Sequence, residues 1–410
     1  MFGFVVLLAG AVFGSVSLTY PFGRDQAIYA YAGKLLLEGK MNYLYVFDLK
    51  PPGIHFLFAF IQFVSGESMF NTRIFDIFWQ SITAFVVLVI AYRVTREKLL
   101  AVIASFIYIF LYYRQDYWHT LQADGSLNLL FALSVLLLLS SHDSHSFIKL
   151  FFAGILLTVA LLFKYTIVSF LPLLFIVLLL DKKELFSLRV KNVLVYSCGL
   201  IFAGLAVLSL YYLTHSLSAF WDIQFTQTPL YTKIAYETET GGYISAQLLK
   251  LFTYSVYSPL IWLSFGGFIY LAVKRKLDFT GLILLAWVVS SLFSLIIQWK
   301  FYYYHFLVII PAVSVGAVLG LSVIKKLLVN RSLLFRFVLI VFIIGFTALA
   351  FKPYFQNYET LFSYVSGKEN LESVYIKNGF TSDTVFMVGK TLKAVEIVKN
   401  ETGIEDGIYV

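Results

Sequence analysis

The stretch VLVYSCGLIFAGLAVLSLYYL, residues 193–213, is 21 residues long and contains no charged side chain. A helix of about 20 mostly apolar residues can cross the hydrocarbon core of a bilayer, which is about 30 Å thick. Comparable apolar runs recur along the chain, at residues 2–19, 70–92, 99–113, 125–141, 147–163, 165–180, 249–273, 279–298, 306–324 and 333–351. Together they predict an all-α polytopic membrane protein with about eleven transmembrane helices.

The composition excludes most other classes of protein. Of the 410 residues, 60% are hydrophobic and 13% are charged, whereas soluble domains are about 25% charged. A soluble enzyme, a disordered chain and a fibrous protein are therefore excluded. The single cysteine, Cys198, excludes a disulfide framework and a cysteine-based metal site. The net charge of +8 does not indicate a nucleic-acid partner, because an excess of Lys and Arg in a membrane chain marks its cytoplasmic loops.

The loop charges also predict the orientation. Lys and Arg concentrate in alternate loops, which we expect in the cytoplasm: 93–98, 182–191, 274–276 and 325–336. The loops expected outside are 20–52, 114–124, 214–247 and 299–305, followed by the segment after residue 351. The first outer loop, 20–69, breaks this bias with four basic residues, and that requires a local reason. Within this loop, the apolar run 53–64 is too short to cross a bilayer, so we expect it to form a re-entrant or interfacial helix.

The two ends of the chain differ in character. Residues 1–17 lack the basic start of a signal peptide, so we expect them to remain as the first span. The later change in composition predicts a membrane domain at 1–351 and an extracytoplasmic soluble domain at 352–410. The soluble segment has a helical pattern around 392–398, and its final Ile-Tyr-Val suits the opening of a strand. Because a lone strand is not stable, we expect the start of an incomplete α/β domain.

The first outer loop holds the densest group of polar residues. Asp25 precedes a run with helical periodicity, and Gly39 suits the end of that helix. The run fits an amphipathic helix that lies on the outer leaflet. Asp25 is either a functional carboxylate at the membrane–water boundary, with Arg24 beside it, or only the cap of this helix.

The segment Asp48-Leu-Lys50-Pro51-Pro52-Gly53 follows in the same loop. Its two prolines hold the chain extended after Lys50 and forbid a helix there. Lys50 therefore lies on a stiff elbow directly before an apolar segment. A cation fixed at the level of the headgroups suits a lipid phosphate, although an ordinary snorkelling lysine gives the same pattern.

Further charged residues lie at the ends of later outer loops. Asp124 opens the span 125–141, where it could be a helix cap, and Lys164 interrupts two short apolar runs. Lys300 and His305 flank three tyrosines, which commonly anchor a helix at the interface; His305 alone also suits a hydrogen-bonded surface histidine. No Walker loop, GxGxxG or HExxH sequence occurs, so nucleotide binding and zinc hydrolysis have no support.

These residues place two or three carboxylates and four or five cations at one face, beside apolar walls. A sugar carried on a lipid phosphate has a good leaving group, because phosphate departs without protonation. One carboxylate can then serve as general base for an acceptor hydroxyl, while fixed cations stabilise the departing phosphate. Attack from the face opposite the phosphate would invert the anomeric centre. The paired acid and base of a glycosidase are not required.

At these residues the chain resembles the GT-C glycosyltransferases, in particular the bacterial, family 39-like branch related to protein O-mannosyltransferases and to the aminoarabinose transferase of lipid A. The resemblance rests on Asp25-Gln-Ala-Ile-Tyr29-Ala-Tyr31, Asp48-Leu-Lys50-Pro51-Pro52-Gly53, Asp124, Lys164-Tyr165-Thr166 and Lys300-Phe-Tyr-Tyr-Tyr-His305. It implies a GT-C fold, a polyprenyl-phosphate sugar donor, and catalysis at the outer face of the bacterial inner (plasma) membrane.

The resemblance also implies roles for individual residues. Asp25 matches the expected base, Lys50 the contact of the donor phosphate, and Asp124 a second acidic residue of the site. Further candidates are Arg24, Lys300 and His305 for the phosphate, and Asp48, Lys164 and Tyr29 for other contacts. Members of the family often have two adjacent acidic residues in the first loop, but Gln26 follows Asp25 here. A divalent metal is therefore only an option, and we assign it no ligand.

Three functions compete at this stage. The leading hypothesis is an inverting glycosyltransferase that acts on a lipid, glycan or protein acceptor. A transporter or flippase of a lipid-linked sugar would bind near the midplane between repeated halves, but the sequence has no clear half-to-half symmetry. A non-catalytic membrane subunit would use its outer loops to bind a partner, and its outer carboxylates would then be replaceable.

Overall fold

The computed structural model describes residues 2–181, 184–238, 241–253, 255–328, 354–378 and 388–403, with isolated positions between 333 and 345. In these ranges the chain forms helices joined by loops, and no strand. The helices are α1 (Phe2–Gly14), η1 (Ser15–Thr19), α2 (Arg24–Leu37), α3 (Gly53–Ser65), α4 (Met69–Thr95), α5 (Lys98–Tyr113), α6 (Ala123–Ser144), α7 (Phe147–Leu161), η2 (Tyr165–Ser169), α8 (Phe170–Leu180), α9 (Phe186–Leu213), α10 (Leu217–Trp221), η3 (Asp222–Gln227), α11 (Thr228–Thr238), α12 (Gly241–Thr253), α13 (Ser258–Val273), α14 (Phe279–Ile296), η4 (Tyr303–Ile309), α15 (Ile310–Leu327), α17 (Tyr354–Val365), α18 (Leu371–Asn378) and α19 (Val388–Glu401).

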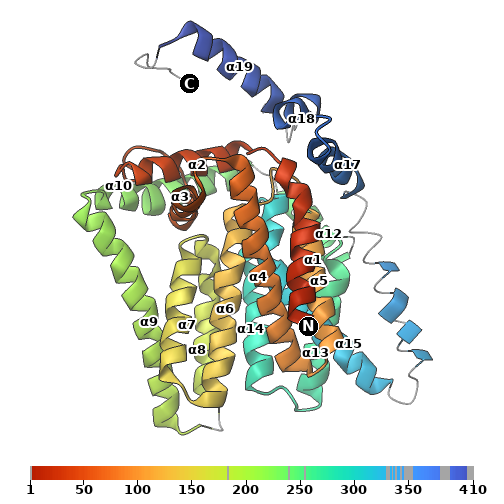
Figure 1. Ribbon diagram of the computed structural model, residues 1–410. Helices are drawn as coiled ribbons and strands as arrows, with labels where there is room; N and C mark the ends of the chain where they lie inside the picture. The colour runs from red at the N-terminus through yellow and green to blue at the C-terminus, as the bar shows by residue number, and fades with distance from the viewer. Residues whose placement is uncertain are drawn as a thin grey trace.

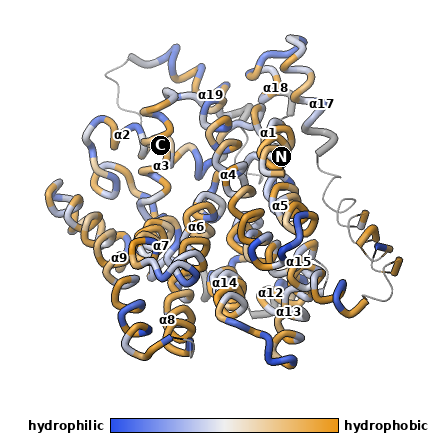
Figure 2. Tube along the Cα trace, turned by 60° about the horizontal axis from the view of Figure 1, so that its bottom comes forward, coloured by the Kyte–Doolittle hydropathy of each residue, from blue (hydrophilic) through white to orange (hydrophobic). Residues whose placement is uncertain are grey.

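The long helices stand side by side as a bundle, with α9 at one edge (Figure 1). α15 lies in the interior, and every residue from Ile310 to Val323 is buried. Gly316 and Gly320 lie one turn apart and let α15 approach α13 so closely that a side chain at Gly320 would collide with the carbonyl of Leu263. Small residues at this spacing allow tight helix packing in membranes, where apolar burial between helices provides little drive. Hydrophobic residues cover the upright helices, and hydrophilic residues concentrate near their ends (Figure 2).

Ten of the eleven predicted spans coincide with described helices. Six helices are long and apolar enough to cross a membrane, and a bent pair could make a seventh. Three shorter apolar helices cover the predicted spans 99–113, 147–163 and 165–180. The eleventh predicted span, 333–351, lies mostly outside the described residues, so the total of eleven stays a prediction. The chain is thus a multi-pass, all-helical membrane protein.

The predicted span 249–273 is not one continuous helix. α12 and α13 meet at an angle of 70°, and Pro259 stands in the first turn of α13. Proline lacks the N–H that continues a helix, so Pro259 suits the start of α13 and explains why α12 does not run into it.

The loops separate by charge, as the sequence predicts. The turns between α4 and α5, α8 and α9, and α13 and α14 lie at one end of the bundle, and α2, α3 and α10 at the other (Figure 1). At the basic end, Arg93 pairs with Asp143 and Lys325 pairs with Glu97. Which end faces the cytoplasm stays a prediction.

The first outer loop forms two helices that lie across the bundle end (Figure 1). α2 ends at Leu37, and Gly39 then turns the chain with a φ of +76°, a conformation that glycine adopts without strain. The predicted caps are wrong, because both helices begin two residues earlier than the sequence suggests. Gly23 is the N-cap of α2 and Gln122 that of α6, so Asp25 and Asp124 each occupy the second helical position. The positive end of a helix favours a carboxylate there, but neither aspartate is needed as a cap.

The C-terminal helices lie over the same end of the molecule as α2 (Figure 1). α17 contacts the start of the chain, where the Tyr358 hydroxyl donates to the carbonyl of Val12 at 3.3 Å. Val374 and Tyr375 of α18 are buried in a cluster with Tyr117 and Trp118. The predicted helix at 392–398 is confirmed within α19, whereas the predicted strand lies outside the described residues. The boundary between two domains and the α/β character of the second stay predictions.

Candidate active site

The Lys50 elbow is held by contacts on both sides. The Lys50 N–H donates to Asp48 Oδ1 at 3.2 Å, a side-chain turn typical of aspartate. The Lys50 carbonyl accepts from the Tyr43 hydroxyl at 2.7 Å and from Gln224 Nε2 at 3.2 Å. The other Asp48 oxygen pairs with His55 at 2.8 Å. Asp48 therefore helps to shape the elbow.

Gly53 brings this elbow against the end of α7. Its N–H donates to the carbonyl of Leu162 at 2.7 Å, and a Cβ at this position would lie 2.8 Å from the same oxygen. Only glycine fits such a close approach without displacing backbone. Because Lys164 follows Leu162 by two residues, this contact sets the Lys50 elbow beside the loop that carries Lys164.

Lys164 and Asp124 form a buried ion pair. Lys164 Nζ lies 3.1 Å from Asp124 Oδ2, and their side chains are 12% and 1% exposed. The other oxygen, Asp124 Oδ1, is buried without a hydrogen-bond partner. Burial lowers the pKa of Lys164 to about 8; Asp124 opposes this change, and the charge of Lys50 adds to it. The charge of Lys50 therefore reaches the Lys164 ammonium and lowers its pKa.

Lys50 interacts with residues from three other segments, α2, α6 and η4. Its Nζ lies 5.0 Å from the centre of the Tyr304 ring and 3.5 Å from the Tyr304 hydroxyl. Burial disfavours the Lys50 charge, but Tyr29, Tyr304, Asp25 and Asp124 outweigh it and raise the pKa of the ammonium well above its ordinary value. Asp25 and Asp124, from two different helices, thus both act on Lys50. We call Asp25, Lys50, Asp124, Lys164 and Tyr304 the charged cluster.

His305 and Lys300 border the charged cluster. His305 is 4% exposed, and its Nδ1 is buried without a hydrogen-bond partner. The charges of Lys164, Lys50 and Lys300 all reach His305. Lys300 itself lies over the ring of Tyr231, with Nζ 3.9 Å from the ring centre. An unpaired buried ring nitrogen beside several cations suits an oxygen-rich, anionic ligand.

Arg24 and Tyr29 are placed differently by α2. Arg24 is exposed, and its guanidinium lies 5.7 Å from the centre of the Trp118 ring. Tyr29 is buried, and its hydroxyl donates to Gln122 Oε1 at 2.9 Å. Burial raises the pKa of Tyr29 well above its ordinary value, so the phenol stays neutral. Of these two candidates, only Tyr29 faces the charged cluster.

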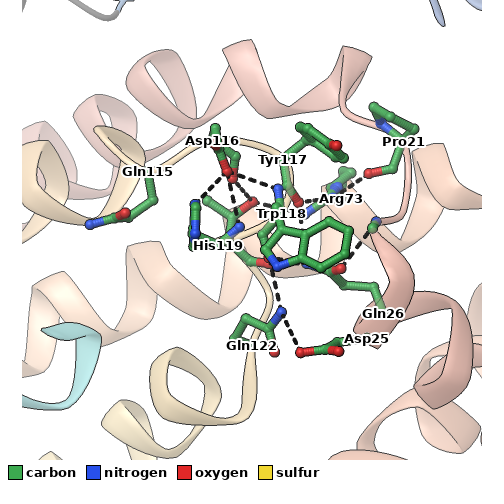
Figure 3. A network of polar contacts seen from close by, with 12 residues as sticks. Pro21, Asp25, Gln26, Arg73, Gln115, Asp116, Tyr117, Trp118, His119 and Gln122 are labelled. Carbon is green, nitrogen blue, oxygen red and sulfur yellow. Dashed lines mark hydrogen bonds and ion pairs between the residues drawn. The ribbon is translucent and has the colours of Figure 1, made fainter. Parts of the chain in front are cut away.

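The second outer loop, 115–122, is fixed by two buried side chains (Figure 3). Arg73 is completely buried and donates to the carbonyls of Tyr20, Pro21 and Tyr117 and to the Thr120 hydroxyl, at 2.7 to 3.3 Å. Gln26 Nε2 lies 2.8 to 3.2 Å from the carbonyls of Tyr117, Trp118 and Thr120. We call Arg73, Gln26 and this loop the loop scaffold.

The loop scaffold explains why Gln26 follows Asp25. Gln26 Oε1 accepts from the N–H of Gly23 at 3.0 Å while its amide N–H groups face carbonyls. A carboxylate in its place has no N–H to give to these carbonyls, so a second acidic residue would be repelled. Gln26 therefore points into the loop and away from the charged cluster.

The sequence alone did not point to Arg73 or Gln122 as residues that hold the candidate site. Arg73 could have been found, because a charge inside an apolar run is rare and marks a paired or functional group. Gln122 carries no such signal, since an uncharged amide in a loop has no distinctive pattern.

The described residues do not suggest a metal site. Among them, no three His, Cys, Asp or Glu side chains lie close enough to hold an ion. We therefore derive no step through a metal.

Comparisons with known proteins agree with the fold. No curated protein sequence matches the chain. Residues 49–212 match the family model described as dolichyl-phosphate-mannose-protein mannosyltransferase. That segment begins at the Lys50 elbow and includes Asp124 and Lys164.

Two solved structures have a fold similar to that of this chain over nearly its whole length. The archaeal oligosaccharyltransferase AglB from Archaeoglobus fulgidus, in complex with an inhibitory peptide and a dolichol-phosphate, has a TM-score of 0.50 and 14% identity, covering 100% of this chain and 61% of its own. The apo form of the Archaeoglobus fulgidus oligosaccharyltransferase has a TM-score of 0.50 and 15% identity, with coverage of 99% and 61%. This chain therefore spans about three fifths of the length of those proteins. The family match covers residues 49–212 of the 410, and over the whole chain the helical fold is similar to that of these oligosaccharyltransferases.

Proposed function

We propose that this chain is an inverting glycosyltransferase that moves a sugar from a polyprenyl-phosphate donor to a hydroxyl acceptor at the outer face of the membrane. The observation that carries the proposal is the charged cluster, in which Asp124 pairs with Lys164 at 3.1 Å and both Asp25 and Asp124 act on the charge of Lys50. A helix cap or a snorkelling lysine needs no such meeting. The names of the relatives support the donor class, because they mention dolichyl-phosphate-mannose and a bound dolichol-phosphate.

The reaction needs one base and fixed cations. Asp25 accepts the proton of the acceptor hydroxyl, and the acceptor oxygen forms a bond to the anomeric carbon. The bond between that carbon and the phosphate oxygen breaks, and its electron pair leaves with the polyprenyl phosphate. Lys50 stabilises the charge that collects on the leaving phosphate, and Lys164 adds a second positive charge beside Asp124.

The environment of Lys50 suits this role. Its ammonium stays charged at any physiological pH, because the surrounding phenols and carboxylates raise its pKa. The elbow also fixes its backbone through Tyr43 and Gln224, so little reorganisation is needed when charge develops. The apolar helix α3 starts directly after the elbow, where an isoprenoid chain can lie in the bilayer.

The first experiment replaces Asp25 with Asn, which keeps the size of the side chain and removes the proton acceptor. The purified chain in lipid nanodiscs is given polyprenyl-phosphate hexoses and pentoses, and transfer to acceptors is measured by mass spectrometry. We expect a loss of about 10²- to 10⁴-fold in kcat, the usual contribution of a general base.

The matched control is Asp222→Asn, which removes an exposed carboxylate at the same end of the molecule. We expect it to keep full activity. If Asp25→Asn keeps most of its activity while folding normally, the assignment of the base is wrong. If the unaltered chain transfers no sugar from any donor of this class, the proposed function itself is wrong.

A further inference from the structure

Gln122 connects the proposed base to the loop scaffold (Figure 3). Its Nε2 lies 3.5 Å from Asp25 Oδ2 and 2.9 Å from the carbonyl of Trp118. Its Oε1 accepts from the Tyr29 hydroxyl at 2.9 Å. The contact with Asp25 is long for a hydrogen bond, as catalytic contacts commonly are before substrate binds.

The three contacts fix which way the amide points. The Trp118 carbonyl and the Asp25 carboxylate can only accept, so both require the N–H side of the amide. The Tyr29 hydroxyl can donate, which suits the carbonyl side. A flipped amide would place Oε1 against two acceptors. Gln122 is also completely buried, so water cannot replace the contacts that a flip would break.

Because of its position in the chain, Gln122 can connect two helices through its contact with Asp25. Gln122 is the N-cap of α6 and stands two residues before Asp124. Tyr29 and Asp25 lie four residues apart on α2, and therefore on the same face of that helix. One amide thus connects the helix that carries Asp25 to the helix end that carries Asp124.

We propose that Gln122, with its amide oriented by Tyr29, is a positioning residue that aims the Asp25 carboxylate at the acceptor hydroxyl. This inference rests on the proposed function. Its N–H steers the ionised carboxylate, the form that accepts a proton, and it leaves the other oxygen, Oδ1, for the acceptor. Gln122 itself touches neither donor nor acceptor in this scheme.

The test is a double-mutant cycle between Gln122→Ala and Asp25→Asn. In the native background we expect Gln122→Ala to lower kcat by about 10- to 100-fold, because small errors in the position of a catalytic group cost this much. The KM for the donor should change by less than about twofold. In the Asp25→Asn background the same substitution should cost nothing further, since the group through which Gln122 acts is gone.

Tyr29→Phe provides a milder second variant. It keeps the ring and removes only the hydroxyl that orients the amide. We expect a loss of about fivefold in kcat, near the value of one neutral hydrogen bond, and again no loss in the Asp25→Asn background. This variant keeps the inference testable if Gln122→Ala disturbs the loop.

Gln62→Met is the matched control. Gln62 Nε2 also donates to α2, to the carbonyl of Ala30 at 2.8 Å, but it has no contact with Asp25 among the described interactions. Its effect should be small and equal in both backgrounds. Gln122 losses that persist undiminished in the Asp25→Asn background, or a native kcat unchanged by Gln122→Ala, would overturn the inference. Neither result touches the proposed function, which fails only if the unaltered chain transfers no sugar from any polyprenyl-phosphate donor.

Discussion

The loop scaffold and the charged cluster meet at Gln122 but satisfy their polar groups differently. In the loop scaffold, the buried polar atoms of Arg73, Gln26 and Gln122 all have protein partners in the described structure. In the charged cluster and its border, Asp124 Oδ1 and His305 Nδ1 are buried without hydrogen bonds. A buried unsatisfied polar group costs about 1–3 kcal/mol. The difference agrees with the proposal that the loop scaffold sets positions and that the charged cluster binds a ligand.

The largest effect expected from this comparison is on stability. Arg73→Ala removes a buried guanidinium and its hydrogen bonds to the carbonyls of Tyr20 and Pro21 and to the Thr120 hydroxyl, and it leaves the Tyr117 carbonyl with Gln26 alone. We expect a destabilisation of about 4 kcal/mol or more, the range of broken buried networks. Thermal unfolding of the purified chain in detergent, followed by tryptophan fluorescence, measures it.

The control for this prediction is Lys40→Ala. Lys40 pairs with Glu38 at 2.8 Å, and both side chains are well exposed, so the substitution should not change the unfolding temperature measurably. An Arg73→Ala variant that unfolds at the native temperature would show that the loop scaffold does not hold the loop, and the contrast between the two regions would fail.

The contrast also explains what the sequence could predict. The apolar runs were sufficient to predict ten helical segments, of which six or seven are long enough to cross a membrane in the described residues. The elbow at Lys50 was visible because two prolines fix the backbone. Charge was sufficient to find Asp25, Lys50 and Asp124. Their meeting, however, depends on Gly53 lying against the carbonyl of Leu162, and nothing in the local sequence encodes that contact.

The errors have the same origin. Both predicted helix caps were wrong by two residues, because Gly23 and Gln122 occupy the N-caps and the sequence pattern does not favour them over Asp25 and Asp124. The role of Arg24 at the donor phosphate stays a prediction. Only the three-dimensional position shows that Arg24 faces outward onto Trp118.

A second, smaller effect concerns pH. Lys164 has a pKa lowered to about 8, chiefly by burial, whereas the pKa of Lys50 is raised well above its ordinary value. A lysine is charged below its pKa, so a rise in pH through 8 removes the charge of Lys164 and leaves that of Lys50. If Lys164 faces the donor phosphate, the apparent affinity for the donor should fall by about tenfold between pH 7 and pH 9, the value of one charge-assisted hydrogen bond.

The matched variant for the pH series is Lys164→Gln, which has no charge to lose. Its affinity for the donor at pH 7 should already equal that of the native chain at pH 9, and it should stay flat across the range. A native affinity that does not change between pH 7 and pH 9 would separate Lys164 from the phosphate and leave it only as the partner of Asp124.

The smallest expected effect is the change in donor KM on replacing Arg24. Comparing it with Lys50 tests whether an exposed cation on α2 contributes to donor binding as a buried one does. Arg24→Ala removes an exposed cation that stacks on Trp118, and an exposed cation–π contact contributes little. We expect the donor KM to change by less than about twofold, whereas Lys50→Ala should raise it by about tenfold or more. Both are measured with the same polyprenyl-phosphate donor at low and high salt, because an exposed charge is screened and a buried one much less so. If Arg24→Ala raises the donor KM as much as Lys50→Ala does, the phosphate lies on the outer side of α2, and the charged cluster is not where the donor binds.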